Sequence, residues 1–320
     1  DKHNNKIDYK HLPLESVGIY VPGSTASYPS SVLMSAIPAI VAQVKRIVMI
    51  NPGYKGNQNP AVLYAAKLCG ISEIYSIGGP SAIAAVTYGT KTIKPVNKIV
   101  GPGNEFVAAA MREVFGDVGV LSMFCGPSEV TIVCDKNSKP DWLASDLVGQ
   151  AEHSDLVQCI LISKNRSIIE KTRMEILKQV KEIPRSSIAK RSLMKYGILL
   201  HVNSDKKIIE IINKIGPEHL ELNIKNYKSY VPKIKSSGSI CLGDFAVMSL
   251  TDMGVPGSNH VLPTNFSSKY SSGLNVSEYM KSISFITLSK RGVDKLGPSA
   301  ITLAENEGLQ AHAQSIIKRI

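Results

Sequence analysis

The chain has 320 residues, 43% of them apolar and 20% charged, a mixture that excludes a disordered or fibrous protein and suits two globular domains. No apolar run approaches the roughly 18 residues of a membrane span, and the first ten residues contain no signal-peptide core, so we expect a cytoplasmic protein that does not bind membranes. The net charge of +11 raises the question of an acidic partner such as nucleic acid.

The basic residues are concentrated between Lys164 and Lys195. Apolar residues of this segment, among them Ile169, Ile176 and Val180, recur roughly at helical spacing, and no aromatic residues interleave the charges. This pattern favours the solvated face of an amphipathic helix over a phosphate-binding surface. We therefore expect no nucleic-acid partner.

The cysteines are odd in number and scattered, without any C-x-x-C spacing: Cys69, Cys125, Cys134, Cys159 and Cys241. This distribution argues against a disulfide framework and against a thiolate zinc site. A metal site in this chain would therefore use nitrogen and oxygen ligands.

The first half of the chain alternates strands with helices. We expect strands over 46–50, 73–79 and 97–100, each followed by a helix, over 59–70, 80–89 and 106–116. The last helix would place Phe106, Val114 and Phe115 on one face. Repeated strand–turn–helix units of this length predict a parallel sheet with helices on both faces.

Glycine-rich turns follow two of these strands, at Gly78-Gly79 and at residues 101–104 (GPGN). Such turns lie at the carboxyl ends of parallel strands, where doubly wound sheets bind dinucleotides. Neither is a full G-x-G-x-x-G motif, because Phe106 occupies the place of the third glycine. A structural turn and a cofactor contact both remain open.

A second unit begins near Val130. Its expected strands are 131–135, 159–163, 196–202 and 237–243, and its first helix covers 141–153, ahead of the long basic helix. The predicted fold class is α/β, with two Rossmann-like units whose parallel sheets are flanked by helices, followed by a helical C-terminal tail.

Histidine and glutamine point to metal or proton chemistry in this second unit. In the helix that ends with QAEH, Gln150 and His153 are three residues apart and would share a face, with Glu152 turned aside. Two ligands do not make a site. Further histidines stand in segments rich in acids, Gly or Pro, at 219, 260 and 312. A structural role for each histidine alone remains the alternative.

Motifs along most of the chain carry a family resemblance. In chain order they are VGIYVPGS (17–24), YPSSVLM (28–34), GGPSAIAA (78–85), KIVGPGN (98–104), GPSE (126–129), QAEH (150–153), GPEHLEL (216–222), SNHVLPT (258–264) and EGLQAH (307–312). From about residue 15 to its end, the chain resembles the histidinol dehydrogenase family. Its members use zinc and two NAD to oxidise L-histidinol to L-histidine, the last step of histidine biosynthesis.

The resemblance implies four segments. Residues 1–19 would be a leader, the remnant of a helical N-terminal region that the family carries and that this chain, which begins without Met, is expected to lack. Residues 20–129 would bind NAD, and residues 130–273 would carry the metal and acid/base residues. The tail over 274–320 would be exchanged between the subunits of a homodimer.

The resemblance also assigns roles to individual residues. It implies that zinc is held by Gln150, His153, Asp252 and His312. His219 would be the general base for the hydroxyl proton, and Glu218 would activate the water that hydrates the aldehyde intermediate. Ser128, His260 and Glu307 would contact the substrate, whereas Tyr20, Ser81 and Asn104 would contact NAD.

The sequence departs from the family pattern at several of these positions. Ser81 stands where the family has a glutamine, and the segment from Asp252 to His260 is one residue longer than usual. Glu105 adds a carboxylate near the expected NAD phosphates. Residues 269–281 resemble paralogues that include sulfopropanediol dehydrogenases. Two alternatives therefore stay open: a zinc- and NAD-dependent dehydrogenase of another alcohol, and an inactive truncated relative.

Overall fold

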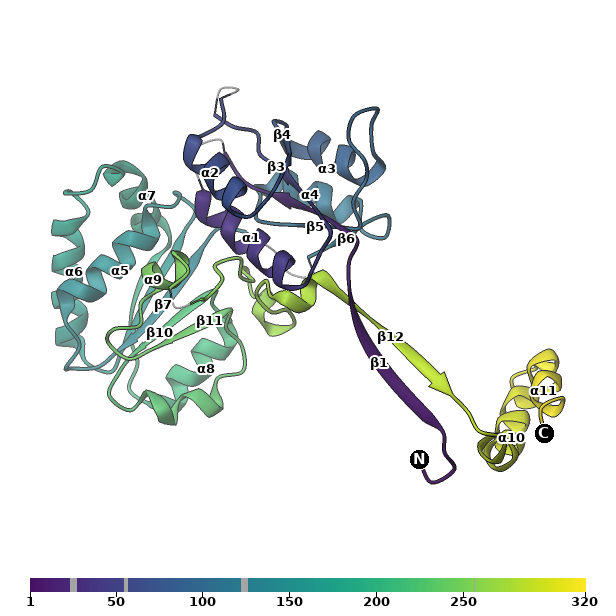
Figure 1. The fold of residues 1–320 in the computed structure, drawn as a ribbon. Helices are drawn as coiled ribbons and strands as arrows, with labels where there is room; N and C mark the ends of the chain where they lie inside the picture. Colours follow the sequence, from purple (N-terminus) through teal and green to yellow (C-terminus); the bar gives the residue numbers. More distant parts are fainter. Residues whose placement is uncertain (24–27, 55–56, 122–125, 256) are drawn as a thin grey trace. The chain divides into compact units, whose positions relative to one another are not determined.

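The computed structural model describes residues 1–320 except 24–27, 55–56, 122–125 and 256 (Figure 1). The chain divides into two compact units. Unit 1 combines Asp1–Pro13 with Met280–Ile320, and unit 2 comprises Leu14–Tyr279. Their positions relative to one another are not determined, so each is described by itself. None of the helices in the described ranges has the length and apolar character that a membrane crossing requires.

Unit 2 begins with a five-stranded parallel sheet in the order β4-β3-β2-β5-β6. Its strands are β2 (Ser16–Tyr20), β3 (Arg46–Ile50), β4 (Glu73–Tyr75), β5 (Lys98–Val100) and β6 (Gly119–Val120). The connecting helices are α1 (Pro29–Val41), α2 (Pro60–Leu68), α3 (Gly79–Tyr88) and α4 (Glu105–Glu113). The strand order reverses between β2 and β5, as in doubly wound dinucleotide-binding sheets.

Local chemistry explains how this sheet is built. The side chains of Asn59 and Asn104 accept hydrogen bonds from main-chain N–H groups at the starts of α2 and α4. After β5, Gly101 has a φ of +110°, and a Cβ atom there would lie 2.2 Å from the carbonyl oxygen of Tyr20. Only glycine permits this conformation together with this close approach.

The apolar face predicted for the helix after residue 105 is wrong only for its two phenylalanines. Phe106 in α4 and Phe115 just after it are exposed, whereas Val107 and the C-cap residue Val114 are buried in the core that α4 shares with α3 and the sheet. Val107 and Val114 are seven residues apart and therefore lie on one side of the helix, which leaves the two phenylalanines on its flanks.

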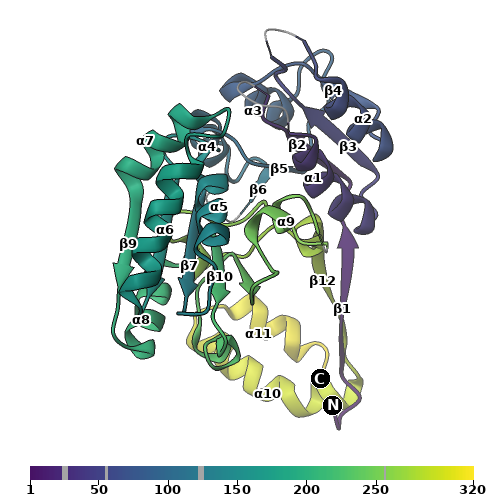
Figure 2. The same cartoon turned by 90° about the vertical axis from the view of Figure 1, so that its left-hand side faces the viewer.

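The second sheet of unit 2 is also parallel, with the order β11-β10-β7-β8-β9. Its strands are β7 (Glu129–Cys134), β8 (Gln158–Ser163), β9 (Gly197–His201), β10 (His219–Asn223) and β11 (Ser239–Leu242). Helices α5 (Pro140–Ala151), α6 (Arg166–Gln179) and α7 (Ser186–Tyr196) pack on one face, and α8 (Asp205–Ile215) packs on the other (Figure 2). The prediction of two Rossmann-like units is confirmed.

The side chains of β10 point alternately to the two faces of the sheet, which places its polar residues on the face of the candidate site. Leu220 and Leu222 point into the core beneath α8. His219, Glu221 and Asn223 therefore point to the opposite face, and all three are buried. Polar side chains buried on a sheet face need partners, and α5 and the short helix α9 (Met248–Asp252) lie on this side.

Short 3-10 turns occupy the connections in the last part of unit 2: Tyr227–Ser229, Val231–Lys233, Ser267–Lys269 and Val276–Tyr279. The described cysteines 69, 134, 159 and 241 are free, and Cys125 lies outside the described residues.

Unit 1 is a two-stranded antiparallel ribbon with two helices. The strand β1 (Lys6–Pro13) pairs with β12 (Met280–Thr287) along its whole length. The helices α10 (Lys290–Asn306) and α11 (Gln310–Ile317) contact each other. Residues 6–13, which we expected to be part of a leader, thus form a strand with the C-terminal segment, and the expected boundary at residue 20 falls at the end of β2.

Candidate active site

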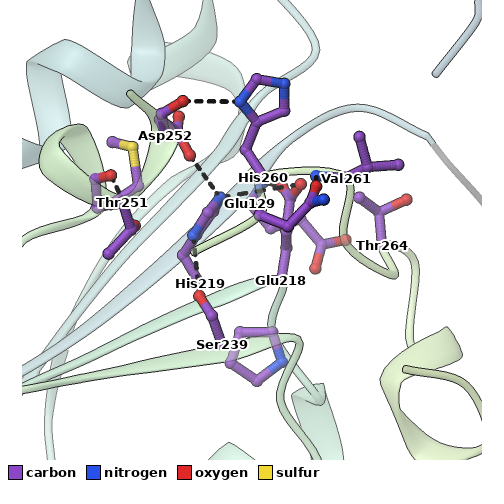
Figure 3. A network of polar contacts seen from close by, with 12 residues as sticks. Glu129, Glu218, His219, Ser239, Thr251, Asp252, His260, Val261 and Thr264 are labelled. Atoms are coloured by element: carbon purple, nitrogen blue, oxygen red, sulfur yellow. Dashed lines mark hydrogen bonds and ion pairs between the residues drawn. The ribbon is translucent and has the colours of Figure 1, made fainter. Parts of the chain in front are cut away.

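The site is organised around His219, the first residue of β10 (Figure 3). Its ring is 2% exposed. The Nδ1 atom lies 3.2 Å from the hydroxyl oxygen of Ser239 on the neighbouring strand β11. The Nε2 atom lies 3.4 Å from Oδ1 of Asp252 and 3.9 Å from Oε1 of Glu218. Ser239 therefore orients the ring so that Nε2 faces two carboxyl groups.

Burial controls the protonation of these groups. Burial first, and then the nearby charges of His260 and His153, lower the pKa of His219 to about 3. Burial raises the pKa of Glu218 well above its usual range. It also raises the pKa of Asp252 to about 7. The histidine is therefore neutral at physiological pH and able to accept a proton.

Glu218 is held by the adjacent strand. Its Oε2 atom accepts the main-chain N–H of Glu129 at 2.8 Å. Glu129 in turn uses Oε1 to accept the N–H of Asn265 at 2.9 Å, and burial raises the pKa of its carboxyl group. Glu129 was not among the predicted site residues, although it ends the GPSE motif. Ser128, directly before it, is half-buried and accepts the N–H of Gln158 through its main-chain oxygen.

Asp252 is the last residue of α9, and His260 fixes the loop that follows. The Nδ1 atom of His260 lies 2.7 Å from the main-chain oxygen of Asp252, so this nitrogen carries the proton. Its Nε2 atom then accepts the hydroxyl of Ser31 on α1 at 3.2 Å. Next to it, the Asn259 amide donates to the carbonyl of Met34 at 2.8 Å. The loop after α9 thus joins the two sheets of unit 2.

Gln150 lies in the last turn of α5 and is 0% exposed. Among the residues that the structure describes, neither the nitrogen nor the oxygen of its amide has a hydrogen-bond partner. A buried amide without a partner is costly, and a bound ligand or ion is one explanation for such a group.

His153 departs from the helical placement predicted by the sequence. Helix α5 ends at Ala151, and the N–H of His153 donates to the carbonyl of Gln150 at 3.2 Å. The ring remains accessible from solvent, although the surrounding protein desolvates it enough to lower its pKa. The charge of His153 also acts on His219, so the two rings belong to one neighbourhood.

The donor set of unit 2 fits zinc. Gln150 has an unpaired amide oxygen, Oδ1 of Asp252 accepts no hydrogen bond, and His153 has an accessible ring. Nitrogen and oxygen donors of these types bind zinc. Within the described ranges, however, no cluster of three or more His, Cys, Asp and Glu residues is arranged to hold a metal. The fourth expected ligand, His312, lies in α11 of unit 1, and the full ligand set stays a prediction.

Unit 1 carries the two C-terminal site predictions. Glu307 is the C-cap residue of α10, and His312 lies in the first turn of α11. Both side chains are exposed. The structure does not place them relative to the residues of unit 2.

The three residues expected to contact NAD lie at the carboxyl edge of the first sheet. The hydroxyl of Tyr20, at the end of β2, accepts the N–H of Gly79 at 3.2 Å. Ser81 donates to the carbonyl of Gly78 at 3.2 Å, and Asn104 accepts the N–H of Val107 at 3.1 Å. Ser81 and Asn104 are exposed at the starts of α3 and α4. This edge flanks the reversal of strand order and fits a dinucleotide.

Comparisons with known proteins agree along the whole chain. The family model for histidinol dehydrogenase matches residues 1–320. Histidinol dehydrogenase of Pelagibacter ubique (strain HTCC1062) is 68% identical over 320 residues, which cover all of this chain and 74% of that protein. A crystal structure of histidinol dehydrogenase from Elizabethkingia anophelis has a TM-score of 0.94 at 39% identity and covers 98% of this chain and 72% of its own.

A more distant neighbour shares the fold alone. The crystal structure of an acetylating aldehyde dehydrogenase from Geobacillus thermoglucosidasius has a TM-score of 0.60 at 13% identity. It covers 90% of this chain and 78% of its own.

Proposed function

Because the chain belongs to the histidinol dehydrogenase family of oxidoreductases, we propose that it oxidises L-histidinol to L-histidine, by way of the aldehyde, with zinc and two NAD. One arrangement carries this proposal: a buried, neutral His219 directs Nε2 toward two carboxyl groups, and in the same unit a buried Gln150 amide lacks a hydrogen-bond partner among the described residues. Such a site combines a proton acceptor with donors for a cation.

Gln150, His153, Asp252 and His312 would hold zinc, which supplies Lewis-acid polarisation and an anchor for the nitrogen atoms of the substrate. Tyr20, Ser81 and Asn104 would line the NAD site, where the nicotinamide accepts hydride. The homodimer with an exchanged tail over 274–320 remains part of this proposal.

His219 takes the proton in each oxidation. We place its ring proton on Nδ1, toward the Ser239 hydroxyl, which leaves the lone pair of Nε2 free. As the alcohol carbon loses hydride, the hydroxyl proton moves to Nε2. Asp252 and Glu218, 3.4 Å and 3.9 Å away, are placed to stabilise the imidazolium that forms.

Glu218 serves the hydration of the aldehyde between the two oxidations. The N–H of Glu129 holds its Oε2, while Oε1 is too distant from His219 for a hydrogen bond and remains available for water. The water oxygen bonds to the aldehyde carbon as the water proton passes to the ionised carboxylate of Glu218. The C=O π electrons move to the aldehyde oxygen, which takes the proton held on Nε2 of His219, so that His219 is again neutral for the second oxidation. The carboxyl groups of Glu129, Glu218 and Asp252 also suit a substrate that carries an imidazole and an amine.

The alternative alcohol substrate rested on the sequence of residues 269–281. In this segment, Glu278 pairs with Lys98 at 2.5 Å, and the Tyr279 hydroxyl donates to the carbonyl of Ser35 at 2.7 Å. These contacts attach the segment to the first sheet and its helix α1. These contacts give residues of the segment a packing role and do not indicate a second substrate.

The experiment is to measure NADH formed per L-histidinol consumed, before and after removal of zinc by a chelator and after its return. We expect two NADH per substrate, lost with the chelator and regained with zinc. NADH formation with a sulfonated diol but not with histidinol would overturn the substrate. Turnover of histidinol that survives complete removal of the metal would overturn the role of zinc.

A further inference from the structure

The N-terminus of α9 is held by a side chain of the neighbouring sheet. Val247, at the N-cap position, supplies no side-chain hydrogen bond. Instead, the N–H of Met248 donates to Oε1 of Glu221, 2.7 Å away. A carboxyl oxygen at this position compensates an N–H group that the helix itself leaves unpaired. Because Asp252 ends this five-residue helix, Glu221 helps to place Asp252.

The other oxygen of Glu221 belongs to a buried pair of carboxyl groups. Oε2 of Glu221 and Oδ2 of Asp146 are both buried, and neither has a hydrogen-bond partner among the other described groups. The two carboxyl groups are close enough for a hydrogen bond between them to raise the pKa of Glu221 and lower that of Asp146. Carboxylates only accept hydrogen bonds, and two buried like charges repel, so the contact requires one proton between them.

The surroundings indicate which residue keeps this proton. Burial and the charge of Asp146 raise the pKa of Glu221 to about 8. Burial raises the pKa of Asp146 to about 6, although the hydrogen bond with Glu221 lowers it. At neutral pH, Glu221 is therefore the protonated donor and Asp146 the ionised acceptor.

We propose that Asp146 and Glu221 share one proton and act as positioning residues that hold α5, β10 and α9 together. Asp146 lies one helical turn before Gln150 on α5, and Glu221 shares a face of β10 with His219. Helix α9 contacts both elements (Figures 1 and 2). The pair thereby sets the spacing of Gln150, His219 and Asp252. The assignment of two of these residues to zinc rests on the proposed function.

Infrared spectroscopy of the full chain tests the shared proton. The wild-type spectrum at neutral pH should contain the C=O stretch of a protonated carboxyl group that shifts in ²H₂O, and the Glu221→Gln variant should lose this component. Burial also raises the pKa of Glu218, so Glu218→Gln is the matched control: it should remove only its own contribution and leave the Glu221 component in place. A Glu221→Gln spectrum that keeps every protonated-carboxyl component of the wild type would overturn the pair.

Zinc titration tests the positioning role without any turnover. Glu221→Ala should weaken zinc binding by about 10–100-fold, as outer partners of metal ligands do. Glu221→Gln should restore most of it, because its amide can accept from Met248 and donate to Asp146. If Glu221→Ala does not fold, Asp146→Ala, which keeps the Met248 contact, replaces it. Equal zinc affinity in the wild type and all variants would show that Asp146 and Glu221 do not position the zinc ligands.

The two measurements separate this inference from the proposed function. A wild-type protein that shows the Glu221 component but neither binds zinc nor oxidises histidinol would contradict the proposed function and leave the proton-sharing pair standing. A zinc-dependent histidinol dehydrogenase without that component would contradict the pair alone.

Discussion

Nε2 of His219 lies 3.4 Å from Oδ1 of Asp252, so the expected general base directly faces an expected metal ligand. The two residues come from different elements, the start of β10 and the end of α9, and lie 33 positions apart in the chain. In the proposed function, Asp252 would bind the cation while His219 receives the proton beside it. Mutation of each residue should therefore affect metal binding and proton transfer separately.

His219→Asn should lower the rate of NADH formation by about 10²–10⁴-fold, because the amide cannot accept the hydroxyl proton. Zinc content should stay near that of the wild type, since His219 is not among the expected ligands. Steady-state kinetics and metal analysis of the same sample measure both. Ser239→Ala removes only the hydroxyl that orients the ring, so it should lower the rate of NADH formation less than His219→Asn does. A His219→Asn variant that keeps most of the wild-type rate would refute the assignment of His219 as the base.

His153→Ala should lose both zinc and activity, because it removes a nitrogen ligand that is accessible next to Gln150. Metal content per chain, measured after dialysis against a low zinc concentration, checks this. His201→Ala is the matched control, since His201 ends β9 and contacts the main chain of Lys164. Equal zinc loss in both variants would point to general destabilisation.

Gln150→Met should have opposite effects on the metal-free and the zinc-loaded protein. Without metal, the variant removes a buried amide that has no partner, which should stabilise the fold by about 1–2 kcal/mol. With zinc, it should lower the affinity by removing an oxygen ligand. Thermal unfolding with and without zinc compares the two states. A metal-free variant less stable than the wild type would indicate that the amide has a structural role.

Arg46 and Glu73 should stabilise the first sheet except in acid. Nε of Arg46 donates to Glu73 at 2.8 Å, and the second guanidinium nitrogen donates at 2.9 Å. The hydrogen bonds with Arg46 lower the pKa of Glu73. The stabilisation is therefore present above the unfolded pKa of about 4.3 and is lost as the pH falls through the folded value.

Urea unfolding of the wild type and Glu73→Gln across this pH range checks the effect. The difference in unfolding free energy should shrink toward zero in acid. A difference that stays constant with pH would show that the charge of Glu73 contributes nothing.

Gly101→Ala should destabilise the protein more than Gly116→Ala. Both glycines have positive φ, +110° and +106°, so both variants carry backbone strain of about 1–3 kcal/mol. At Gly101 the new Cβ would also lie 2.2 Å from the Tyr20 oxygen, whereas at Gly116 it meets nothing within 4 Å. The difference in melting temperature between the two variants measures the effect of the steric clash at position 101. Equal decreases in melting temperature would contradict the close approach of Gly101 to Tyr20.

Several elements could be predicted because their patterns are local. Strand β3 occupies 46–50 as expected, and the strands and helices predicted between 59 and 163 appear with shifted ends. Strand β10 was not predicted, although HLELN alternates leucines with polar residues as strands do. Its polar residues are buried, because α5 and α9 lie on that face and Ser239 of β11 contacts His219.

The amino-acid sequence by itself determined the α/β class, the two Rossmann-like units and the family, because hydrophobic periodicity and contiguous motifs are properties of neighbouring residues. Only the tertiary structure decided that Glu129 and His219 begin their strands, that His219 faces Asp252, and that Asp146 lies against Glu221. These groups are distant in the chain. Their protonation depends on burial and on neighbours that only the packing of α5, α9 and β10 brings together.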